Sequence, residues 1–406
     1  MKILLLLSWK SLLNRKVTSL LSILTIAIAV LLLLGVERVR SQTKQSFANT
    51  ISATDLIVGA RSGQVNLLLY SVFRMGNPTQ NISWKSYRKF ADDKRVAWTV
   101  PFSLGDSHRS FRVLGTNSDY FKYYKYSNKQ PLVFADGTGF DNQFGAVIGS
   151  QVAKKLGYVV GQKIVVAHGV SDKSFNRHDN SPFTVKGILA PTGTAVDKTV
   201  HVTLQAIEAI HARLGSHQSN AQPSQITAFL IGTHSKMQIF SLQRQIANYK
   251  PQALSAILPG VALQELWSIM SIAEQALLIV AFFVVIAGML GVLSSLLTSL
   301  QARRREIAIL RGMGASARQI VTLLLTEVVL ISNIGIIVGV ALMYLLTATL
   351  SGYIRSEYGL TFSMDMLNEN EILFLIAVQL LALLVGFIPA ITGYRQSLSD
   401  GMTVRS

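Results

Sequence analysis

The sequence contains no cysteine, and only 15% of its residues are charged. Soluble domains carry roughly 25% charged residues, so the low charge content favours a membrane protein. The absence of cysteine excludes a disulfide framework and thiolate chemistry. Nine prolines and 29 glycines form no low-complexity tract or collagen-like period.

Several catalytic motifs are absent as well. The chain lacks the G-x-S-x-G motif of hydrolases, the H-E-x-x-H motif of metalloproteases and the G-x-x-x-x-G-K-[ST] loop that cradles ATP phosphates. No hydrolase or transferase site is predicted, and we expect no cofactor bound by this chain. Any ATP used in its function must be bound by another polypeptide.

Acidic residues are scarce, with 21 Asp and Glu against 38 Lys and Arg and a formal net charge of +17. Residues 37–270 hold 26 basic and 13 acidic residues, which is a net charge of +13. This charge is spread diffusely, and the aromatic residues near it do not form RNA-binding motifs. We therefore expect no nucleic-acid partner.

Four uncharged or nearly uncharged apolar runs are long enough to cross a bilayer. They are residues 17–36, 272–297, 320–346 and 372–391. Before the first run, residues 1–16 contain four cations, no acid and Trp9, which predicts an amphipathic helix on the cytoplasmic membrane surface that contacts membrane lipids.

The charges that flank these runs predict the topology. Cations gather in the N-terminal segment, in residues 301–316 and in the tail, whereas acids gather in residues 351–371. Because positively charged loops stay in the cytoplasm, both termini and residues 301–316 are predicted to be cytoplasmic. Residues 37–270 then lie outside, and the chain is a multi-pass protein of the inner (plasma) membrane.

Residues 37–270 contain no run apolar enough to span a membrane and predict a mixed domain. Apolar β-branched stretches predict strands, and helical periodicity, in several cases after a Ser or Thr cap, predicts helices. The strands are expected near 146–148, 164–166, 183–189 and 225–230, the helices near 83–94, 150–156, 204–214 and 236–249, and a mobile loop at 216–224. The predicted fold is a membrane protein with four transmembrane α-helices and a large α+β extracytoplasmic domain between the first and second.

The densest basic cluster is the stretch QARRREIAILRGMGAS at residues 301–316. It predicts a short amphipathic helix at the membrane surface that ends in a glycine turn. A positive-inside anchor loop would explain its arginines, but not the Glu, the apolar triplet or the G-x-G ending. The stretch resembles the cytoplasmic coupling segment of FtsX/MacB-type ABC transporter permeases. The resemblance implies contact with an ATPase through Arg303, Arg304, Arg305, Glu306, Ile309, Leu310, Arg311, Gly312 and Gly314.

Short fragments of residues 37–270 extend the resemblance. DLIVGA at 55–60, VLGT at 113–116, VIG at 147–149 and FTVKG at 183–187 follow the order of the periplasmic core domain of MacB-type permeases. One span, a large domain and three further spans form the layout that MacB and LolC/LolE share. The resemblance thus implies a MacB-like periplasmic core domain at 37–270 and an FtsX-like permease domain at 271–406.

The resemblance also implies the function. The chain is expected to be a permease subunit that transmits motion from a separate cytoplasmic ATPase, which binds ATP and Mg, to its periplasmic domain. It would act with a second permease subunit, as a homodimer or heterodimer. Lipoprotein release, export of a lipid or peptide through a periplasmic adaptor, and activation of a cell-wall hydrolase all remain open. The alternative is a non-transporting membrane sensor or scaffold with a ligand-binding outer domain.

Small and polar residues within the spans are further candidates. Gly335 and Gly339 form a G-x-x-x-G, which favours close helix contact either between subunits or within the chain, and Gly288 and Gly291 form a second small-residue face. Glu327 lies inside the third span, where a carboxylate needs a partner. A structural pair, with Arg318 or a partner chain, is favoured over a proton relay.

All seven histidines fall within residues 37–270. His168 and His178, with Asp172 and Asp179 nearby, suggest a metal site, but they lack the tight two-His spacing of helical or finger sites. We therefore assign no metal ligand from the sequence.

Overall fold

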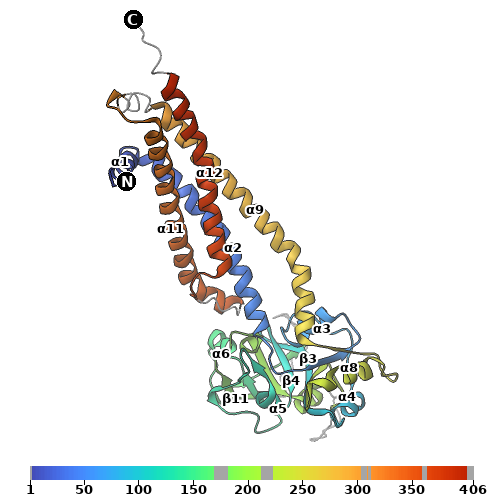
Figure 1. Ribbon diagram of the computed structural model, residues 1–406. Helices are drawn as coiled ribbons and strands as arrows, with labels where there is room; N and C mark the ends of the chain where they lie inside the picture. Colours follow the sequence, from blue (N-terminus) through green and yellow to red (C-terminus); the bar gives the residue numbers. More distant parts are fainter. Residues whose placement is uncertain are drawn as a thin grey trace. The chain divides into compact units, whose positions relative to one another are not determined.

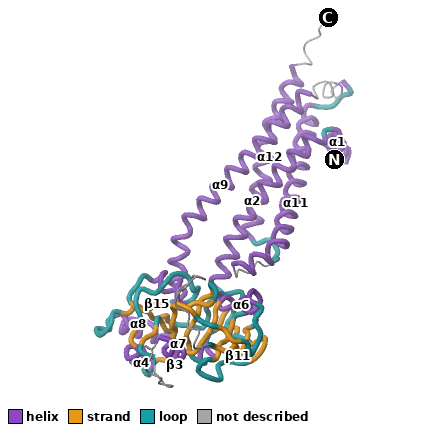
Figure 2. The backbone as a smooth tube through the Cα atoms, turned by 180° about the vertical axis from the view of Figure 1, so that it is seen from behind, coloured by secondary structure: helices purple, strands orange, loops and turns teal. Residues whose placement is uncertain are grey.

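The computed structural model describes residues 2–168, 182–211, 223–302, 309, 312–358 and 364–399. The chain divides into two compact units. The first, here the helical unit, consists of Met1–Gln42, Ser271–Gly352 and Phe362–Ser406. The second, here the α/β unit, consists of Thr43–Met270 and Tyr353–Thr361. In the described residues the strands all belong to the α/β unit (Figure 2).

The helical unit is built on four long helices (Figure 1). They are α2 (Lys16–Ala48), α9 (Pro259–Ala302), α11 (Ala317–Tyr358) and α12 (Glu369–Ser399). Each is long and apolar enough to cross a membrane, over Lys16–Ala48, Pro259–Thr298, Arg318–Ile354 and Glu369–Gly393. The four apolar runs identified in the sequence lie within these helices.

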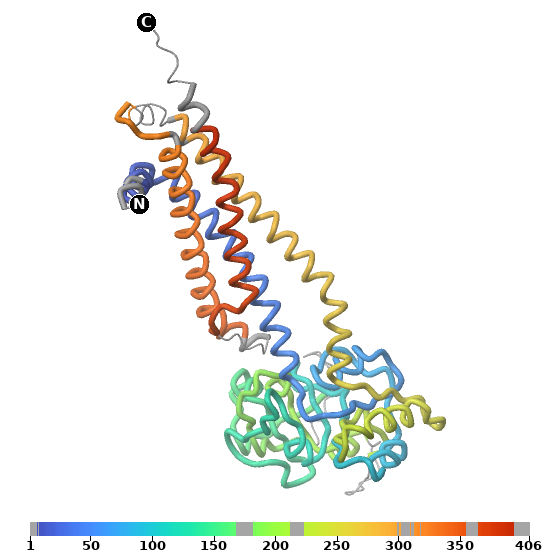
Figure 3. Tube along the Cα trace, viewed as in Figure 1, coloured from blue at the N-terminus to red at the C-terminus, as the bar shows by residue number. Residues whose placement is uncertain are grey.

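The interior of the helical unit is apolar. Ile26 and Leu34 of α2, Met289 of α9, Val328 of α11 and Ala382 of α12 are buried in one cluster. Because lipid tails are as apolar as these side chains, close packing rather than burial from water holds such helices together. The shorter α1 (Lys2–Asn14) precedes α2 and contributes Leu12 to the same cluster. In Figure 3, α1 is the dark blue helix at the start of the chain.

The α/β unit is organised around one 11-stranded mixed sheet with the order β15-β1-β14-β3-β4-β12-β8-β11-β7. β10 pairs with β3 and β9 pairs with β11 off this path. The β4–β12 and β8–β11 pairs are parallel, and the other pairs are antiparallel. The strands are β1 (Leu56–Ala60), β3 (Val96–His108), β4 (Phe111–Thr116), β7 (Phe134–Gly137), β8 (Gly145–Ile148), β9 (Lys163–Ile164), β10 (Ala167–His168), β11 (Phe183–Leu189), β12 (Thr199–Thr203), β14 (Ala228–Thr233) and β15 (Leu254–Ile257).

Short helices and two small ribbons complete this unit. The helices are α3 (Gln64–Ser71), α4 (Trp84–Ala91), α5 (Asp119–Tyr123), α6 (Ser150–Leu156), α7 (Leu204–His211), α8 (Ile239–Ala247) and the 3₁₀ turns η1 (Ala195–Lys198) and η2 (Lys236–Gln238). β2 (Ile82–Ser83) pairs with β13 (Gln225–Ile226), and β5 (Lys125–Tyr126) pairs with β6 (Gln130–Pro131). Apolar residues of α3 and α5 pack in one cluster, while those of α4 and α8 pack in another.

The local predictions and the observed elements agree in outline. A strand or helix lies within each predicted stretch except 164–166, where β9 ends at Ile164 and Val165 and Val166 separate it from β10. The predicted strand at 225–230 is divided between β13 and β14. Ser83 and Thr203 accept hydrogen bonds from the first turns of α4 and α7, but α6 follows Gly149 and α8 follows Gln238 without a side-chain cap. Most of the predicted loop at 216–224 lies outside the described residues.

Candidate functional site

The predicted coupling segment is described only in part. Arg303, Arg304, Arg305, Glu306, Leu310 and Arg311 lie outside the described residues. Ile309 is helical and exposed, and Gly312 is exposed as well. Gly314 has a φ of 98°, which is the left-handed turn expected for the G-x-G ending.

A capping arrangement joins this turn to α11. The Ser316 backbone N–H donates to the Gln319 side chain at 2.8 Å, and the Gln319 N–H faces the Ser316 hydroxyl at 3.4 Å. Such reciprocal contacts satisfy free N–H groups at a helix start and fix the direction in which the chain enters the helix. Residues 312–319 therefore connect the predicted coupling segment to α11 through an ordered turn.

The glycine faces of the spans contact α2 of the same chain. A Cβ on Gly335 would lie 2.7 Å from Ile26, and a Cβ on Gly339 would lie 2.8 Å from Val30. A Cβ on Gly288 would lie 3.5 Å from Thr25, which is ordinary contact. The sequence left contact between subunits and contact within the chain equally open. In this structure, α11 uses the Gly335–Gly339 face for contact within the chain.

Glu327 is buried and accepts a hydrogen bond from the Ser11 hydroxyl of α1 at 3.2 Å. Ser8 of α1 donates to the backbone carbonyl of Leu323, one turn earlier on α11. The expected partner Arg318 is exposed instead. Arg318 and Glu327 are nine residues apart, and an α-helix turns by about 100° per residue. The two side chains therefore lie on opposite sides of α11 and cannot meet. The carboxylate thus links α1 to α11.

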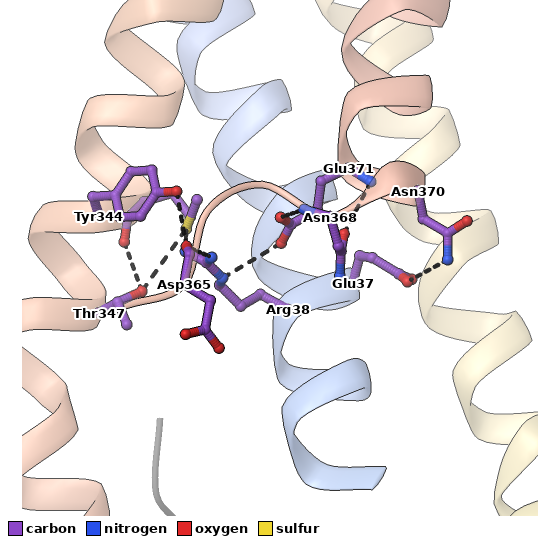
Figure 4. A network of polar contacts seen from close by, with 9 residues as sticks. Glu37, Arg38, Tyr344, Thr347, Asp365, Asn368, Asn370 and Glu371 are labelled. Atoms are coloured by element: carbon purple, nitrogen blue, oxygen red, sulfur yellow. Dashed lines mark hydrogen bonds and ion pairs between the residues drawn. The ribbon is translucent and has the colours of Figure 1, made fainter. Parts of the chain in front are cut away.

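Charged and polar side chains of all four long helices meet in a network that the sequence did not reveal, here called the Arg38 cluster; Figure 4 shows the part of it around Arg38. It consists of Glu37, Arg38 and Arg40 of α2, Glu274 of α9, Tyr344 of α11, Asp365, and Asn368, Asn370 and Glu371 at the start of α12. Glu37, Arg38 and Glu371 are all at most 5% exposed. Burying such charges is costly unless they are paired, so their grouping points to a function.

Arg38 occupies the centre of the cluster. Its Nε lies 3.4 Å from the Glu371 carboxylate, and its Nη2 donates to the backbone carbonyl of Asp365. The guanidinium stands over the Tyr344 ring at 4.9 Å, an arrangement that stabilises a cation. The Tyr344 hydroxyl donates to the same Asp365 carbonyl at 3.0 Å. One guanidinium therefore contacts α11, α12 and the segment between them.

The other α2 charges extend the cluster. Arg40 donates to Glu274 of α9 at 2.8 Å and to Glu37 at 3.0 Å. Glu37 in turn accepts from Asn370 of α12 at 3.3 Å. A shift of α9 or α12 relative to α2 must therefore break or stretch an ion pair or a hydrogen bond.

The start of α12 explains why Glu371 is held in place. Asn368 Oδ1 accepts from the Glu371 N–H at 3.2 Å, and Glu371 Oε2 accepts from the Asn368 N–H at 3.0 Å. This is a capping box, and its Asn-x-x-Glu spacing is the one sequence signal that could have singled out Glu371. Its second oxygen, Oε1, remains available to face Arg38.

Three of the described histidines, His108, His201 and His211, make side-chain contacts within the α/β unit. His108 lies 2.6 Å from the Val165 carbonyl and 2.9 Å from the Tyr158 hydroxyl, and His211 lies 3.3 Å from Asp106. Burial, and then the charge of Arg74, lowers the pKa of His201 to about 3. Among the described residues no three His, Asp or Glu side chains form a metal site. The His168 side chain, His178, Asp172 and Asp179 lie outside the described residues.

Comparison with known proteins gives two family matches. The model of the MacB-like periplasmic core domain matches residues 19–249, and the model of the FtsX-like permease C-terminal region matches residues 278–398. The Macrolide export ATP-binding/permease protein MacB of Shewanella oneidensis is 24% identical over 310 residues. The match covers 73% of this chain and 44% of the relative, so this chain spans less than half the length of that relative.

Two solved structures are similar to part of the chain. The periplasmic region of MacB from Actinobacillus actinomycetemcomitans has a TM-score of 0.36 at 12% identity, over 53% of this chain and 94% of that chain. The extracellular domain of the noncanonic ABC-type transporter YknZ from Gram-positive bacteria has a TM-score of 0.31 at 16% identity, over 50% of this chain and 99% of that chain. The family assignment rests on the two matched domain models, which together cover most of the sequence. The chain belongs to the family of ABC transporter permeases that combine a MacB-like periplasmic core domain with an FtsX-like permease domain.

Proposed function

We propose that this chain is an inner-membrane permease subunit that transmits ATP-driven motion from a separate cytoplasmic ATPase to its α/β unit. The ATPase binds ATP and Mg and contacts residues 301–316. The transmitted motion serves export or extraction of a substrate such as a lipoprotein, lipid or peptide. A second permease subunit completes the assembly.

The Arg38 cluster is the observation that supports this mechanism best. Arg38 contacts α11 and α12, and Arg40 contacts α9, so α2 is bonded to every other long helix of the helical unit. The boundaries between the two units fall within α2, α9 and α11, so each of these helices contributes residues to both units. Movement that enters at α11 through the ordered turn at Gly314 can thus be passed to the α/β unit along α11 itself and, through the Arg38 cluster, along α2 and α9.

The polar groups described around Glu327 also favour transmission of motion over conduction of ions. Glu327 accepts a hydrogen bond from a hydroxyl of α1, and Gln379 of α12 is an amide that does not titrate. A hydrophilic conduit needs a lining of polar groups across the membrane. We therefore assign Glu327 to the attachment of α1 to α11.

The coupling is tested by purifying the detergent-solubilised chain and searching for a co-purifying ATPase. Wild type is compared with a Glu306→Ala/Arg311→Ala variant and with Arg318→Ala, which removes an exposed cation just beyond the segment. We expect the ATPase with wild type and with Arg318→Ala, and its loss or uncoupling in the double variant. If no ATPase accompanies any of the three, the coupling assignment fails and a non-transporting sensor or scaffold takes its place.

The absence of cysteine allows a direct test of the proposed orientation. Met237 of the α/β unit is 91% exposed and Met313 beside Gly314 is 72% exposed, so a single cysteine at either position is accessible to a reagent. A membrane-impermeant maleimide added to intact spheroplasts should label Met237→Cys but label Met313→Cys only after lysis. Equal labelling of both before lysis, or the reverse order, contradicts a cytoplasmic coupling segment with a periplasmic α/β unit.

A further inference from the structure

The α/β unit contains a cavity of about 610 Å³ that is lined by both basic and aromatic side chains. A volume of this size is typical of small-molecule sites. The lining comes from the end of α2, from the segment after α3, from the β3–β4 turn, from α6 and from η1 with the loop before it. α3 and α6 are labelled in Figure 1. Segments distant in the sequence therefore converge on one space.

The charged part of the lining is entirely basic among the residues that the structure describes. Its members are Arg74, Arg109, Arg112, Lys155 and Lys198. Arg109 occupies the tip of the β3–β4 hairpin and is exposed, whereas Arg112 donates through Nη2 to the Gly76 carbonyl at 3.0 Å. Converging cations raise the local concentration of anions, and guanidinium groups suit phosphate because their N–H groups match its oxygens.

Arg74 is the informative member of this group. It is only 9% exposed, and no described carboxylate forms an ion pair with it. Its guanidinium contacts the Ser71 carbonyl and lies 4.9 Å from the centre of the Phe102 ring, while its buried Nε has no hydrogen-bond partner. A buried cation without a counter-ion is costly to the folded state. An anion in the cavity would supply the missing charge.

The buried carboxylate of Asp197, which belongs to η1, does not serve as that counter-ion. It accepts from the Thr192 N–H at 2.8 Å, from the Thr192 hydroxyl at 2.9 Å and from the Gly193 N–H at 2.8 Å. These bonds hold the loop that carries Gly193 and Thr194 along the cavity. Asp197 thus shapes the lining of the cavity.

The lining also contains large apolar side chains. Phe47, Phe73, Met75 and Phe111 contribute to it. Phe47 and Phe73 are in ring contact at 4.6 Å between centroids, and Phe47 also meets Trp267 edge-on at 5.5 Å. Such a surface favours an aliphatic or aromatic group and offers no partner to a fully hydrated anion. The occupant should therefore have both an anionic end and an apolar end.

We propose that this cavity binds a phosphate-headed amphiphile, with the phosphate at the arginines and part of the apolar chain against Phe47, Phe73 and Phe111. Phosphate is favoured over carboxylate because a phosphate monoester carries a charge of about −1.5 to −2, which suits several converging cations. This inference rests on the proposed function and adds to it the chemical class of a ligand. Binding requires neither ATP nor the ATPase, so the two proposals can fail separately.

The test is isothermal titration of the full-length chain in dodecyl maltoside micelles with dodecyl phosphate. The detergent has the same dodecyl chain with an uncharged head, so heat above this background reports the phosphate. Variants Arg109→Gln and Lys155→Gln each remove one lining cation, and Lys154→Gln is the matched control because it removes the neighbouring exposed cation of α6 that does not line the cavity. Inorganic phosphate is titrated separately as the head group alone.

We expect saturable binding of dodecyl phosphate to wild type and Lys154→Gln, weakened about tenfold in each lining variant, which corresponds to about 1.4 kcal/mol. Inorganic phosphate should bind at least tenfold more weakly than dodecyl phosphate. Equal affinity in all three variants would mean that the general positive charge of the chain attracts the ligand, and it would overturn the proposal. Equal affinity for inorganic phosphate would overturn the apolar half of the site, and no binding would overturn the whole.

Discussion

The guanidinium of Arg38 lies 3.4 Å from the carboxylate of Glu371, and their side chains are only 6% and 1% exposed. Breaking a buried pair by neutralising one partner leaves the other charge buried, which typically costs 3–5 kcal/mol. We therefore expect Arg38→Met and Glu371→Gln each to destabilise the helical unit by about 3 kcal/mol. Glutamine still satisfies the capping box with Asn368, so the second change isolates the charge.

The double variant Arg38→Met/Glu371→Gln separates stability from transmission. Without either charge, most of the lost stability should return, and stimulation of the partner ATPase should remain impaired. Stability is measured from the loss of helical circular dichroism in an SDS titration. Arg88→Met, at an ion pair with Asp92 in which both side chains are more than half exposed, is the control and should change stability by less than about 1 kcal/mol. Additive effects of the two single changes would contradict the coupling of Arg38 to Glu371.

The glycine contacts with α2 predict a graded response to added methyl groups. Gly339→Ala places Cβ 2.8 Å from both the Ala27 carbonyl and Val30, so α2 and α11 must separate, at a cost of about 1–3 kcal/mol. Gly291→Ala meets only Thr25 at 3.9 Å and should be neutral or slightly stabilising, because alanine favours the helix. The same SDS titration compares the two. Equal destabilisation would indicate that these contacts do not hold the helices together.

Helices whose sequence signals lie close together along the chain were predictable from the sequence. Apolar runs indicated the four long helices, and the Ser83 cap indicated α4, because both signals lie within a few residues. The long strand β3 was not predicted, since Pro101 and Gly105 interrupt its pattern while its pairing with β4 and β14 is settled by distant residues. Local signals are weak where tertiary pairing decides the structure.

The site was less predictable, for the same reason. The G-x-x-x-G spacing identified Gly335 and Gly339 but not their partner, which lies on α2. Glu371 counted only toward the acidic charge of residues 351–371, and only the assembled helices bring it to Arg38. The hydrogen bond between Ser11 and Glu327 likewise depends on the packing of α1 against α11, which is a tertiary contact.

Two histidines of the α/β unit predict opposite pH dependence. Burial first, and then Arg74, lowers the pKa of His201 from 6.5 to about 3, so the unfolded chain binds its proton more readily. His201 therefore contributes stability above pH 6.5, and this is lost as the pH falls from 6.5 toward 3. The hydrogen bond with Asp106 raises the pKa of His211, so its contribution is present below pH 6.5 and is lost as the pH rises through the folded-state pKa.

Thermal unfolding of His201→Phe and His211→Asn between pH 5 and 7 tests both signs. Tryptophan fluorescence reports mainly the α/β unit, because Trp84, Trp98 and Trp267 lie in it and only Trp9 lies elsewhere. His201→Phe should reduce the fall in Tm toward pH 5, since one fully linked group contributes about 1.36 kcal/mol per pH unit. His211→Asn should make that fall steeper. Parallel pH profiles of wild type and both variants would contradict these assignments.

The uncompensated charge of Arg74 predicts a conflict between stability and ligand binding. In the empty protein, Arg74→Met replaces a buried cation with an apolar side chain of similar length, so it should raise the Tm of the α/β unit. A gain of about 1 kcal/mol corresponds to roughly 2–4 °C for a domain of this size. The same change should abolish binding of dodecyl phosphate, because the phosphate loses its most buried partner. Arg244→Met on the exposed face of α8 is the matched control and should alter neither property. A lower Tm together with undiminished binding would show that Arg74 is a structural cation satisfied within the fold. A higher Tm together with lost binding would show that Arg74 destabilises the empty protein and serves to bind a ligand.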